Sequence, residues 1–366
     1  MEGNAGARTE SAGNMTLVHR VGIIGCGRKA SAIDDEHRWL TNYDALPCSH
    51  ASAYSACPRT QIVAAADPDR RKLEAFGNRW SVSGLYADWR QMLAQEQPTI
   101  VSVITHAPLH AAATIDAARA GAKGIICEKA MAASLAEAGE MIAACAQAGA
   151  RLLVNHPRRY HPTYPLAKAA LDAGEIGELR AMSGLMFDAL IHNGTHLFDM
   201  MRYFAGPAKW VSGCVVAGAG GDPGGFGAVG FERGVVGLVE VQSMQGFELT
   251  LLGTDGRITI NSFEDGFQLW RYRDRRAGQQ GAWFQYGAGK DADVERRRPA
   301  GPVKPPMLAA VEDLVESIER GRAPASSGED GRAALETGLA FHKSSAAGMA
   351  RVDLPLQDKE LRVESR

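Results

Sequence analysis

Residues 20–30 read RVGIIGCGRKA, a short apolar run that ends in closely spaced glycines. In this pattern Gly25 allows a tight turn after a strand, and Gly27 lets backbone N–H groups approach a pyrophosphate. Ala30 takes the third position, where a small residue lets the following helix pack close to the sheet. The stretch therefore predicts a strand, a turn and a helix that together bind a dinucleotide.

A second apolar run, IVAAA over residues 62–66, ends on Asp67. An acid at the end of the second strand is placed to accept hydrogen bonds from an adenosine ribose. Because its charge would repel a 2′-phosphate, Asp67 favours NAD as the cofactor. Arg70 and Arg71 follow closely and keep NADP as an alternative.

The distance between the glycines and Asp67 is about twice the roughly 20 residues usual in this pattern. The extra length lies in Ser31–Ser49, a polar stretch that contains the run DDEHR at residues 34–38. An insertion beside the expected cofactor site is either a lid over the cofactor or substrate or a surface loop, and the sequence leaves both possibilities open.

Length, charge and cysteine usage argue against several classes of protein. The 366 residues are enough for two domains, and a formal net charge of −2 argues against a general nucleic-acid binder. No apolar run approaches the length of a membrane span, and residues 1–15 lack the pattern of a signal peptide. The 6 cysteines lack CxxC spacing and fit free thiols in a reducing compartment. We therefore expect a cytoplasmic protein that binds no membrane, with a disordered tail over residues 1–18.

Two different patterns divide the rest of the chain. Strand and helix patterns alternate over residues 19–154, which predicts a doubly wound parallel sheet of the Rossmann type. Residues 155–356 predict an α+β domain with a large, mostly antiparallel sheet that has one face packed and the other open to a partner. The strands of this sheet are expected at 179–186, 210–216, 226–231, 235–243, 247–252 and 257–261, the helices at 307–320 and 331–349, the loops at 218–227 and 278–306, and a tail at 357–366. Whether the final helix packs back on the first domain stays open.

Glu128 and Lys129 end a predicted strand of the first domain. Ligands of open α/β sheets gather at the carboxyl ends of strands, so Lys129 is placed to reach a substrate beside the cofactor. Its ammonium would donate to a substrate hydroxyl and stabilise the developing alkoxide. The alternative is a surface lysine paired with Glu128.

A second cluster, HNGTHLFD at residues 192–199, opens a helix that is expected to end at Gly206. Oxidation of an alcohol needs a base for the hydroxyl proton, and the imidazole of His196 suits that role. Asp199 lies one helical turn on, where it would orient His196 or complement the helix N-terminus. His192 and His196 have the spacing of a metal pair, but no third ligand has convincing spacing, so no metal site is predicted.

A third cluster, NHPRRYHP at residues 155–162, follows the last parallel strand, where the chain crosses between domains. Arg159 and Tyr160 would hydrogen-bond a polyhydroxylated substrate. The alternative is that the arginines tie the two domains together.

The motifs, in this order, resemble those of the Gfo/Idh/MocA oxidoreductase family, which includes glucose–fructose oxidoreductase and inositol dehydrogenase. The matching segments are GCGRKA at 25–30, CEKA at 127–130, GEIG at 174–177 and GTHLFD at 194–199. The segment SGEDG at 327–331 is also similar to the family's lead-in to its final helix. The resemblance runs from Val21 to about Leu356.

This resemblance implies a Rossmann domain and an open-faced α/β domain whose sheet forms the interface of a homo-oligomer, a dimer or a tetramer. It implies a tightly held nicotinamide cofactor and reversible oxidation of a carbinol in a sugar, cyclitol or glycoside. Carried over by position, Lys129 is the substrate-binding catalytic lysine and His196 the proton-transfer residue.

Departures from the family pattern fall close to these residues. Ala130 stands in place of the proline that follows the lysine, and His106 follows Thr105 where a proline is usual, which puts His106 near the nicotinamide. His192 stands where inositol dehydrogenase-like members have an aspartate. The catalytic set becomes Lys129, His192 and His196, and the sequence leaves open which histidine is the base.

The sequence thus predicts an NAD(H)-dependent oxidoreductase that acts on a small sugar or polyol. The expected cofactor-binding residues are Gly25, Gly27, Arg28, Lys29, Ala30, Asp67, Thr105, His106, Glu128 and Lys129. The expected substrate-binding residues are Arg159, Tyr160, Asn193 and Asp199. Redox-assisted glycoside cleavage with bound NAD, and a sensor that binds NAD(P) without catalysis, are the alternatives.

Overall fold

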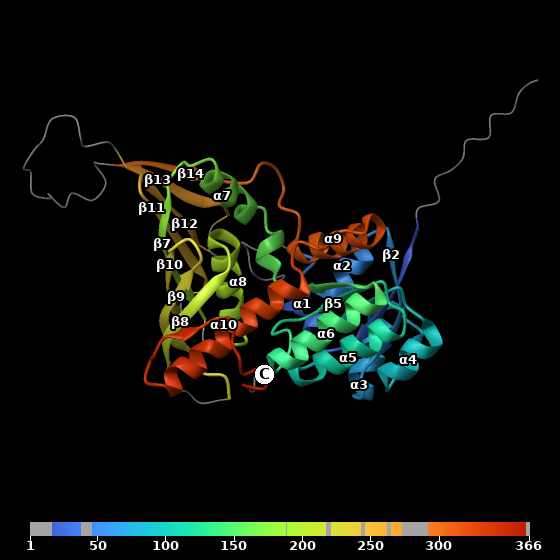
Figure 1. Cartoon of the computed structure of the whole chain (residues 1–366). Coiled ribbons are helices and arrows are strands. Elements are labelled where there is room, and N and C mark those ends of the chain that lie inside the picture. The colour runs from blue at the N-terminus through green and yellow to red at the C-terminus, as the bar shows by residue number, and fades with distance from the viewer. Residues whose placement is uncertain are drawn as a thin grey trace, which may run out of the picture.

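The structure is a computed structural model that describes residues 17–37, 46–187, 189–216, 221–242, 246–261, 265–272 and 292–363. These residues form two α/β domains, each built on its own sheet (Figure 1). The expected fold class, a Rossmann domain followed by a domain with a large, mostly antiparallel sheet, is confirmed. Residues 1–16 of the expected N-terminal tail and 38–45 of the insertion lie outside the described residues.

Within the described ranges the first sheet is 6-stranded and parallel, in the order β3-β2-β1-β4-β5-β6. Its strands are β1 (His19–Ile24), β2 (Thr60–Ala66), β3 (Gly84–Tyr86), β4 (Ile100–Val103), β5 (Gly124–Cys127) and β6 (Arg151–Val154). β4 and β5 are buried along their whole length, as expected of strands covered by helices on both faces. The strand order reverses between β1 and β4, and ligands of such sheets bind beside the carboxyl ends of the strands at that point.

The helices of the first domain follow the strands in alternation. They are η1 (Arg28–Ala32), α1 (Ile33–His37), α2 (His50–Ala56), α3 (Arg70–Trp80), α4 (Trp89–Glu96), α5 (Ala107–Arg119) and α6 (Leu135–Ala148). Asp69, Asp88 and Ser134 cap α3, α4 and α6 by accepting backbone N–H groups of the first turn. The insertion contains α1 and ends at the residue before α2.

The second sheet, as far as the structure describes the chain, is 9-stranded in the order β14-β13-β12-β11-β7-β10-β9-β8-β15. Its strands are β7 (Leu179–Met186), β8 (Ala208–Val215), β9 (Gly225–Phe231), β10 (Val236–Val241), β11 (Glu248–Gly253), β12 (Gly256–Asn261), β13 (Phe267–Tyr272), β14 (Ala292–Arg297) and β15 (Val352–Asp353). β10 runs parallel to β7, and the other neighbouring pairs are antiparallel. The short helices η2 (Pro157–Tyr160) and α7 (Thr163–Asp172) lead the chain from the first sheet to the second.

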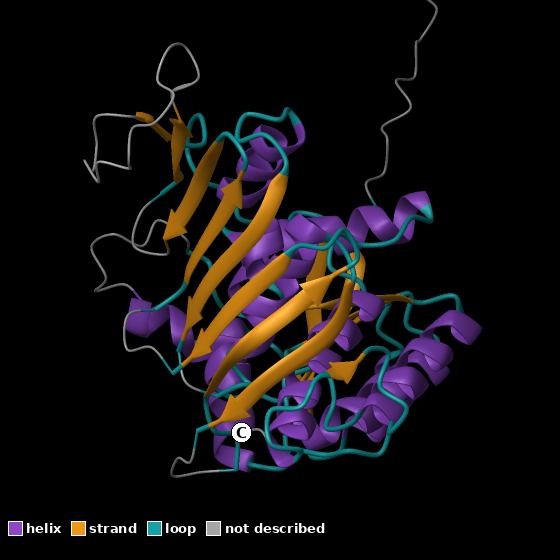
Figure 2. Ribbon diagram, turned by 60° about the vertical axis from the view of Figure 1, so that its left-hand side comes forward, coloured by secondary structure: helices purple, strands orange, loops and turns teal. Residues whose placement is uncertain are grey.

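Helices α8 (Gly194–Ala205) and α10 (Gly328–Ala346) pack on one face of the second sheet, and Figure 2 shows the other face uncovered. Glycines on the strands let these helices approach closely. A Cβ on Gly184 of β7 would lie 2.4 Å from Leu197 of α8, and one on Gly213 of β8 would lie 2.4 Å from Phe341 of α10. The other face stays open, as the sequence predicts (Figure 2).

The prediction of a loop over 278–306 is wrong at β14, which pairs antiparallel with β13. β13 was not expected either. The sequence of β14, ADVERR, lacks the alternating apolar residues that predict a strand. Backbone pairing with β13 holds this segment at the edge of the sheet instead. Residues 273–291 lie outside the described residues.

After β14 the chain returns to the first domain. Helix α9 (Pro306–Arg320) packs beside α2, with Val311 and Leu314 in the same hydrophobic core as Val21. The start of α10 also packs back, since a Cβ on Gly331 would lie 2.6 Å from Val154. The start of the final helix therefore packs on the first domain, which answers the question that the sequence leaves open.

The expected C-terminal tail packs against α6 over its described residues. Lys359 accepts a hydrogen bond from the backbone N–H of Ala136 at 2.9 Å, and Arg362 donates to Glu137 at 2.6 Å. None of the helices in the described ranges has the length and apolar character needed to cross a membrane.

Candidate functional site

The glycine turn follows β1 at the carboxyl edge of the first sheet. Gly25 has φ +95°, and a Cβ there would lie 2.6 Å from the carbonyl oxygen of Ile104, so only glycine fits. A Cβ at Gly27, in contrast, would meet no atom within 4 Å. The open space beside Gly27 and the tight turn at Gly25 fit a bound pyrophosphate.

Asp67 lies directly after β2, next to the glycine turn. Its carboxylate accepts backbone N–H groups from Cys26 and Asp69, each at 2.8 Å. Each carboxylate oxygen has a second lone pair, so the group can still accept hydrogen bonds from a ribose. The first bond fixes the glycine turn relative to β2.

The residues that follow the glycines have different surroundings. Ala30 is fully buried, as a small third position requires. Arg28 is exposed and pairs with Glu36 of α1. Lys29 donates to the carbonyl oxygen of Cys48 at 3.2 Å, at the far end of the insertion.

The loop after β4 carries Thr105 and His106. His106 is exposed and precedes α5, while Thr105 is half-buried. His110, a buried residue that sequence reasoning did not select, lies 3.0 Å from the Thr105 carbonyl oxygen and 2.9 Å from that of Ala130. Its imidazole joins the loop after β4 to the loop after β5.

Lys129 follows β5 and points toward the second domain. Its Nζ donates to the carbonyl oxygen of His192 at 2.6 Å. Burial lowers the pKa of Lys129 to about 8, against the opposing charge of Glu128. The peptide bond between Lys129 and Ala130 is cis. The contact brings the lysine to the segment that opens α8.

The segment before α8 is held by Asp222, which lies on the connection between β8 and β9. The Asp222 carboxylate accepts the backbone N–H groups of Ile191 at 2.9 Å and His192 at 2.7 Å. His196 then lies in the first turn of α8. Burial, together with the positive charge of Lys129, holds the pKa of His196 well below its usual range. Among the described residues, His196 Nδ1 has no hydrogen-bond partner.

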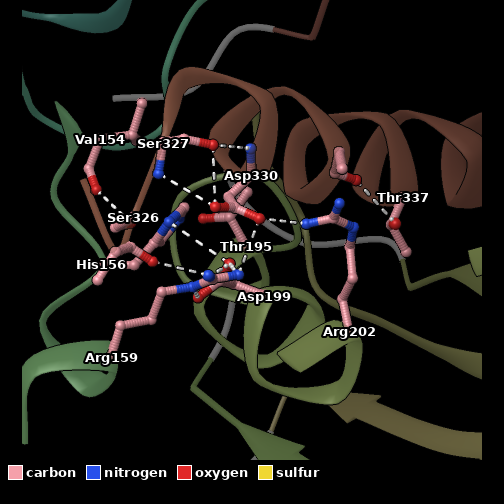
Figure 3. A network of polar contacts seen from close by, with 12 residues as sticks. Val154, His156, Arg159, Thr195, Asp199, Arg202, Ser326, Ser327, Asp330 and Thr337 are labelled. Atoms are coloured by element: carbon pink, nitrogen blue, oxygen red, sulfur yellow. Dashed lines mark hydrogen bonds and ion pairs between the residues drawn. The ribbon is translucent and has the colours of Figure 1, made fainter. Parts of the chain in front are cut away.

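The structure places the Asp199 carboxylate against Arg159 and not against His196, the residue that it was expected to orient. Asp199 has no exposed side-chain surface, and its two oxygens accept hydrogen bonds from Arg159 (Figure 3). The imidazole nearest to its carboxylate is that of His156, at 3.8 Å. His156 in turn packs edge-on against His196, with 5.8 Å between the ring centroids.

Arg159 and Tyr160, which were expected to bind substrate, contact the helices around η2. The contacts of Arg159 fit the alternative that the arginines tie the two domains together. Besides Asp199 on α8, Arg159 contacts Asp330 at the start of α10 at 3.1 Å (Figure 3). The hydroxyl of Tyr160 donates to Asp313 of α9 at 2.9 Å. Both side chains tie η2 to neighbouring helices, because their polar atoms are already bonded within the protein.

Arg158, the preceding residue, is the arginine that lies near the site. Its guanidinium carbon is 4.1 Å from the centre of the Phe247 ring, and its charge lowers the pKa values of both Lys129 and His196. The sequence contains the pair Arg158-Arg159, but nothing in it indicates which of the two points outward. Asn193 occupies the N-cap position of α8 without a side-chain cap bond.

No cluster of three or more His, Cys, Asp or Glu side chains suited to a metal ion occurs among the residues that the structure describes. The groups gathered at the candidate site include the ammonium of Lys129 and the imidazole of His196, whose pKa lies well below its usual range. A polarising ammonium and a neutral imidazole beside a dinucleotide turn are suited to reversible oxidation of an alcohol.

Two family models match the chain. The model described as "Oxidoreductase family, NAD-binding Rossmann fold" matches residues 19–156, and that described as "Oxidoreductase family, C-terminal alpha/beta domain" matches residues 168–354. The two matches correspond to the two sheets of the structure.

Similar proteins include dehydrogenases from several organisms. Myo-inositol 2-dehydrogenase of Thermotoga maritima is 22% identical over 355 residues, which cover 89% of this chain and 96% of that protein. D-apiose dehydrogenase of Paraburkholderia graminis is 37% identical over 129 residues, which cover only 35% of this chain and 34% of that protein.

A solved structure of levoglucosan dehydrogenase in complex with NADH and levoglucosan shares the fold, with a TM-score of 0.75 and 22% identity. The superposition covers 93% of this chain and 100% of that one. With both of its domains matched, the chain belongs to the Gfo/Idh/MocA oxidoreductase family and its first domain is the NAD-binding Rossmann domain of that family.

Proposed function

We propose that this protein reversibly oxidises a carbinol carbon of a sugar, cyclitol or glycoside, with NAD as the hydride acceptor. The observation that carries the proposal is the contact between Lys129 Nζ and the carbonyl oxygen of His192 at 2.6 Å. It brings an ammonium of the first domain to the histidine segment of the second domain, at the edge where the glycine turn lies. Relatives named as dehydrogenases of myo-inositol and D-apiose support this class of substrate.

The residues that would hold NAD lie along the carboxyl edge of the first sheet. The open space at Gly27 would admit the pyrophosphate, and the Asp67 carboxylate would accept hydrogen bonds from the ribose hydroxyls. When bound, NAD supplies the acceptor for the hydride that leaves the carbinol carbon. Asp67 disfavours a 2′-phosphate, so NADH should bind more tightly than NADPH in a fluorescence titration. Equal or tighter binding of NADPH would overturn this preference.

Lys129 and His196 divide the proton chemistry. With its pKa lowered to about 8, Lys129 is mostly protonated at neutral pH and donates to the substrate oxygen, which stabilises negative charge there. His196, whose pKa burial depresses, is neutral and accepts the hydroxyl proton as the carbonyl forms. His192 is the second candidate for the base, and Asn193 and Arg158 are proposed to contact substrate hydroxyls.

A panel of polyols, sugars and glycosides, followed at the absorbance of reduced nicotinamide, tests this function. We expect turnover by the wild type, none by K129A, and similar NADH affinity in both. The base is the histidine, 192 or 196, whose replacement by Asn lowers kcat without weakening NADH binding. Aglycone release without net NADH formation would favour glycoside cleavage. NADH binding without any turnover would favour a sensor.

We further propose that the protein is a homo-oligomer, a dimer or a tetramer, joined through the open face of the second sheet. Leu238 of β10 and Phe226 of β9 lie on this face with 59% and 43% of their surface exposed. Large apolar side chains on neighbouring strands are typical of an interface, since water is a poor environment for them.

A further inference from the structure

A chain of buried polar groups connects the insertion to the residue beside Lys129. His50, the first residue of α2, has no exposed surface. Its Nε2 lies 2.9 Å from Glu128 Oε1, and its Nδ1 lies 3.0 Å from the hydroxyl of Ser102 on β4. The hydroxyl of Tyr54, one turn further along α2, lies 2.8 Å from the same Ser102 oxygen. None of the motifs described above includes His50.

The partners of His50 determine which ring nitrogen carries the proton. Burial lowers the pKa of His50, so its imidazole is neutral and has one N–H. Burial alone would raise the pKa of Glu128, but the hydrogen bond from His50 and the charge of Lys29 hold it well below its usual range. A carboxylate only accepts, so His50 Nε2 is the donor and Nδ1 accepts from Ser102. The donors then run in one direction, from Tyr54 through Ser102 and His50 to Glu128.

Glu128 is held by several groups at once, and they turn its carboxylate into the first domain. Besides His50, the side-chain amide of Asn155 donates to Oε1 at 2.7 Å, and the backbone N–H of Lys129 donates to Oε2 at 3.3 Å. The side chain of Lys129 is left to reach His192 in the second domain. The negative charge of Glu128 raises the pKa of Lys129, which burial lowers.

The position of His50 is itself fixed from the other end of the insertion. Asp34 of α1 accepts the backbone N–H groups of Cys48 at 2.7 Å and Ser49 at 2.9 Å, and the hydroxyl of Ser49 at 2.7 Å. Ser49 caps α2 by accepting the backbone N–H of Ser52 at 3.2 Å. Asp34 is therefore the anchor that joins the two ends of the insertion and sets where α2 begins.

We propose that His50 is a positioning residue for Lys129 that acts through Glu128, and that Asp34 fixes His50 in place. The described ends of the insertion are thus part of the framework of the site. The inference rests on the proposed function only in taking Lys129 as the group that contacts substrate.

The test compares H50L, which removes both bonds, with H50Q, whose amide nitrogen can replace Nε2 as the donor to Glu128. E128Q removes the charge, and H342L removes an imidazole from α10 as the matched control. The measurement is the pKa of Lys129, followed by NMR in protein labelled at the lysine ε-carbon, with the signal assigned from K129R. This measurement needs no turnover, so it stands even if the proposed function fails.

Without the His50 donor, burial favours protonation of Glu128, and Lys129 loses a neighbouring negative charge. We expect the Lys129 pKa to fall in both H50L and E128Q and to stay at the wild-type value in H50Q and H342L. A wild-type Lys129 pKa in H50L would overturn the proposal, as would a fall in H50Q as large as that in H50L. If H50L does not fold, H50N replaces it, because the shorter amide reaches Ser102 but not Glu128.

Turnover supplies the second readout once a substrate is known. At metal sites, partners that orient a ligand through a hydrogen bond change activity by roughly 10- to 100-fold when replaced, and we expect the same range for His50, which acts on Lys129 through Glu128. We expect H50L to lower kcat within that range, H50Q to recover most of it, and the NADH dissociation constant to stay within about twofold in both. An unchanged kcat in H50L would contradict the proposal, whereas a wild type that turns over no substrate would contradict only the proposed function.

Discussion

The side chains around His196 carry mostly positive charge. Lys129, Arg158 and His192 each lower the pKa of His196 beyond the effect of burial. A histidine in such surroundings is neutral at neutral pH and ready to accept a proton. Asp222 supplies a carboxylate whose charge raises the pKa of Lys129, and it reaches the site from the connection before β9.

The pH dependence of turnover follows from these directions. Since burial lowers the pKa of Lys129 to about 8, the ammonium is lost as the pH rises above that value, and kcat/KM for oxidation should fall there. On the acidic side of the pH–rate profile, the fall in kcat/KM caused by protonation of His196 should lie well below pH 6.5. In K129R the guanidinium keeps its proton, so the fall near pH 8 should vanish, although the rate itself is lower. A fall that persists unchanged in K129R would assign it to another group.

The pair between Arg159 and Asp199 should stabilise the fold rather than take part in catalysis. The side chains are 9% and 0% exposed, and breaking one partner of a buried ion pair costs roughly 3–5 kcal/mol. Urea unfolding of R159L should therefore show a loss in that range. The matched control is D35N, since Asp35 and Arg79 form an exposed pair worth about 0–1 kcal/mol. Equal losses in the two variants would contradict this assignment.

The sequence could select Lys129 and His196 as candidates because short motifs mark both positions. It could not tell Arg158 from Arg159, since adjacent residues of one type differ only in the direction in which the fold points them. His50 has no local signal at all. Its role depends on Glu128, which lies 78 positions away along the chain.

The observed helices and strands agree with the sequence-based predictions where the apolar periodicity of the sequence is strong. The strands β7 and β12 and the helix α9 agree closely with the segments expected at 179–186, 257–261 and 307–320. β14 was missed because backbone pairing with β13 stabilises a charged segment. The return of α9 to the first domain was missed as well, because an amphipathic pattern shows that one face is buried but not which partner buries it.

Two glycines of the same turn should respond differently to alanine. In G25A the left-handed backbone and the Ile104 carbonyl oxygen both oppose the new Cβ, so the melting temperature should fall with or without NADH. In G27A the Cβ meets no protein atom, so the melting temperature without NADH should stay near the wild-type value. NADH should bind about tenfold or more weakly to G27A, because the Cβ occupies the space of the pyrophosphate. Unchanged NADH affinity in G27A would place the pyrophosphate elsewhere.

The open face of the second sheet should determine the oligomeric state. A charge at Leu238 would be buried in the proposed interface without a partner, so L238E should lower the mass measured by light scattering after size exclusion. L109E is the control, because Leu109 on α5 is 44% exposed but lies in the other domain. The same mass for wild type and L238E, or dissociation in both variants, would exclude this face as the interface.

In the proposed mechanism, Lys129 of the first domain and His196 of the second meet at the reactive ring of the coenzyme. A crystal structure with NADH and a polyol substrate would test this arrangement. We expect the pyrophosphate on the backbone N–H groups beside Gly27, and the carbinol oxygen within hydrogen-bond distance of both Lys129 Nζ and the imidazole of His196 or His192. A nicotinamide ring bound away from Lys129, or a carbinol held by neither the lysine nor a histidine, would contradict it.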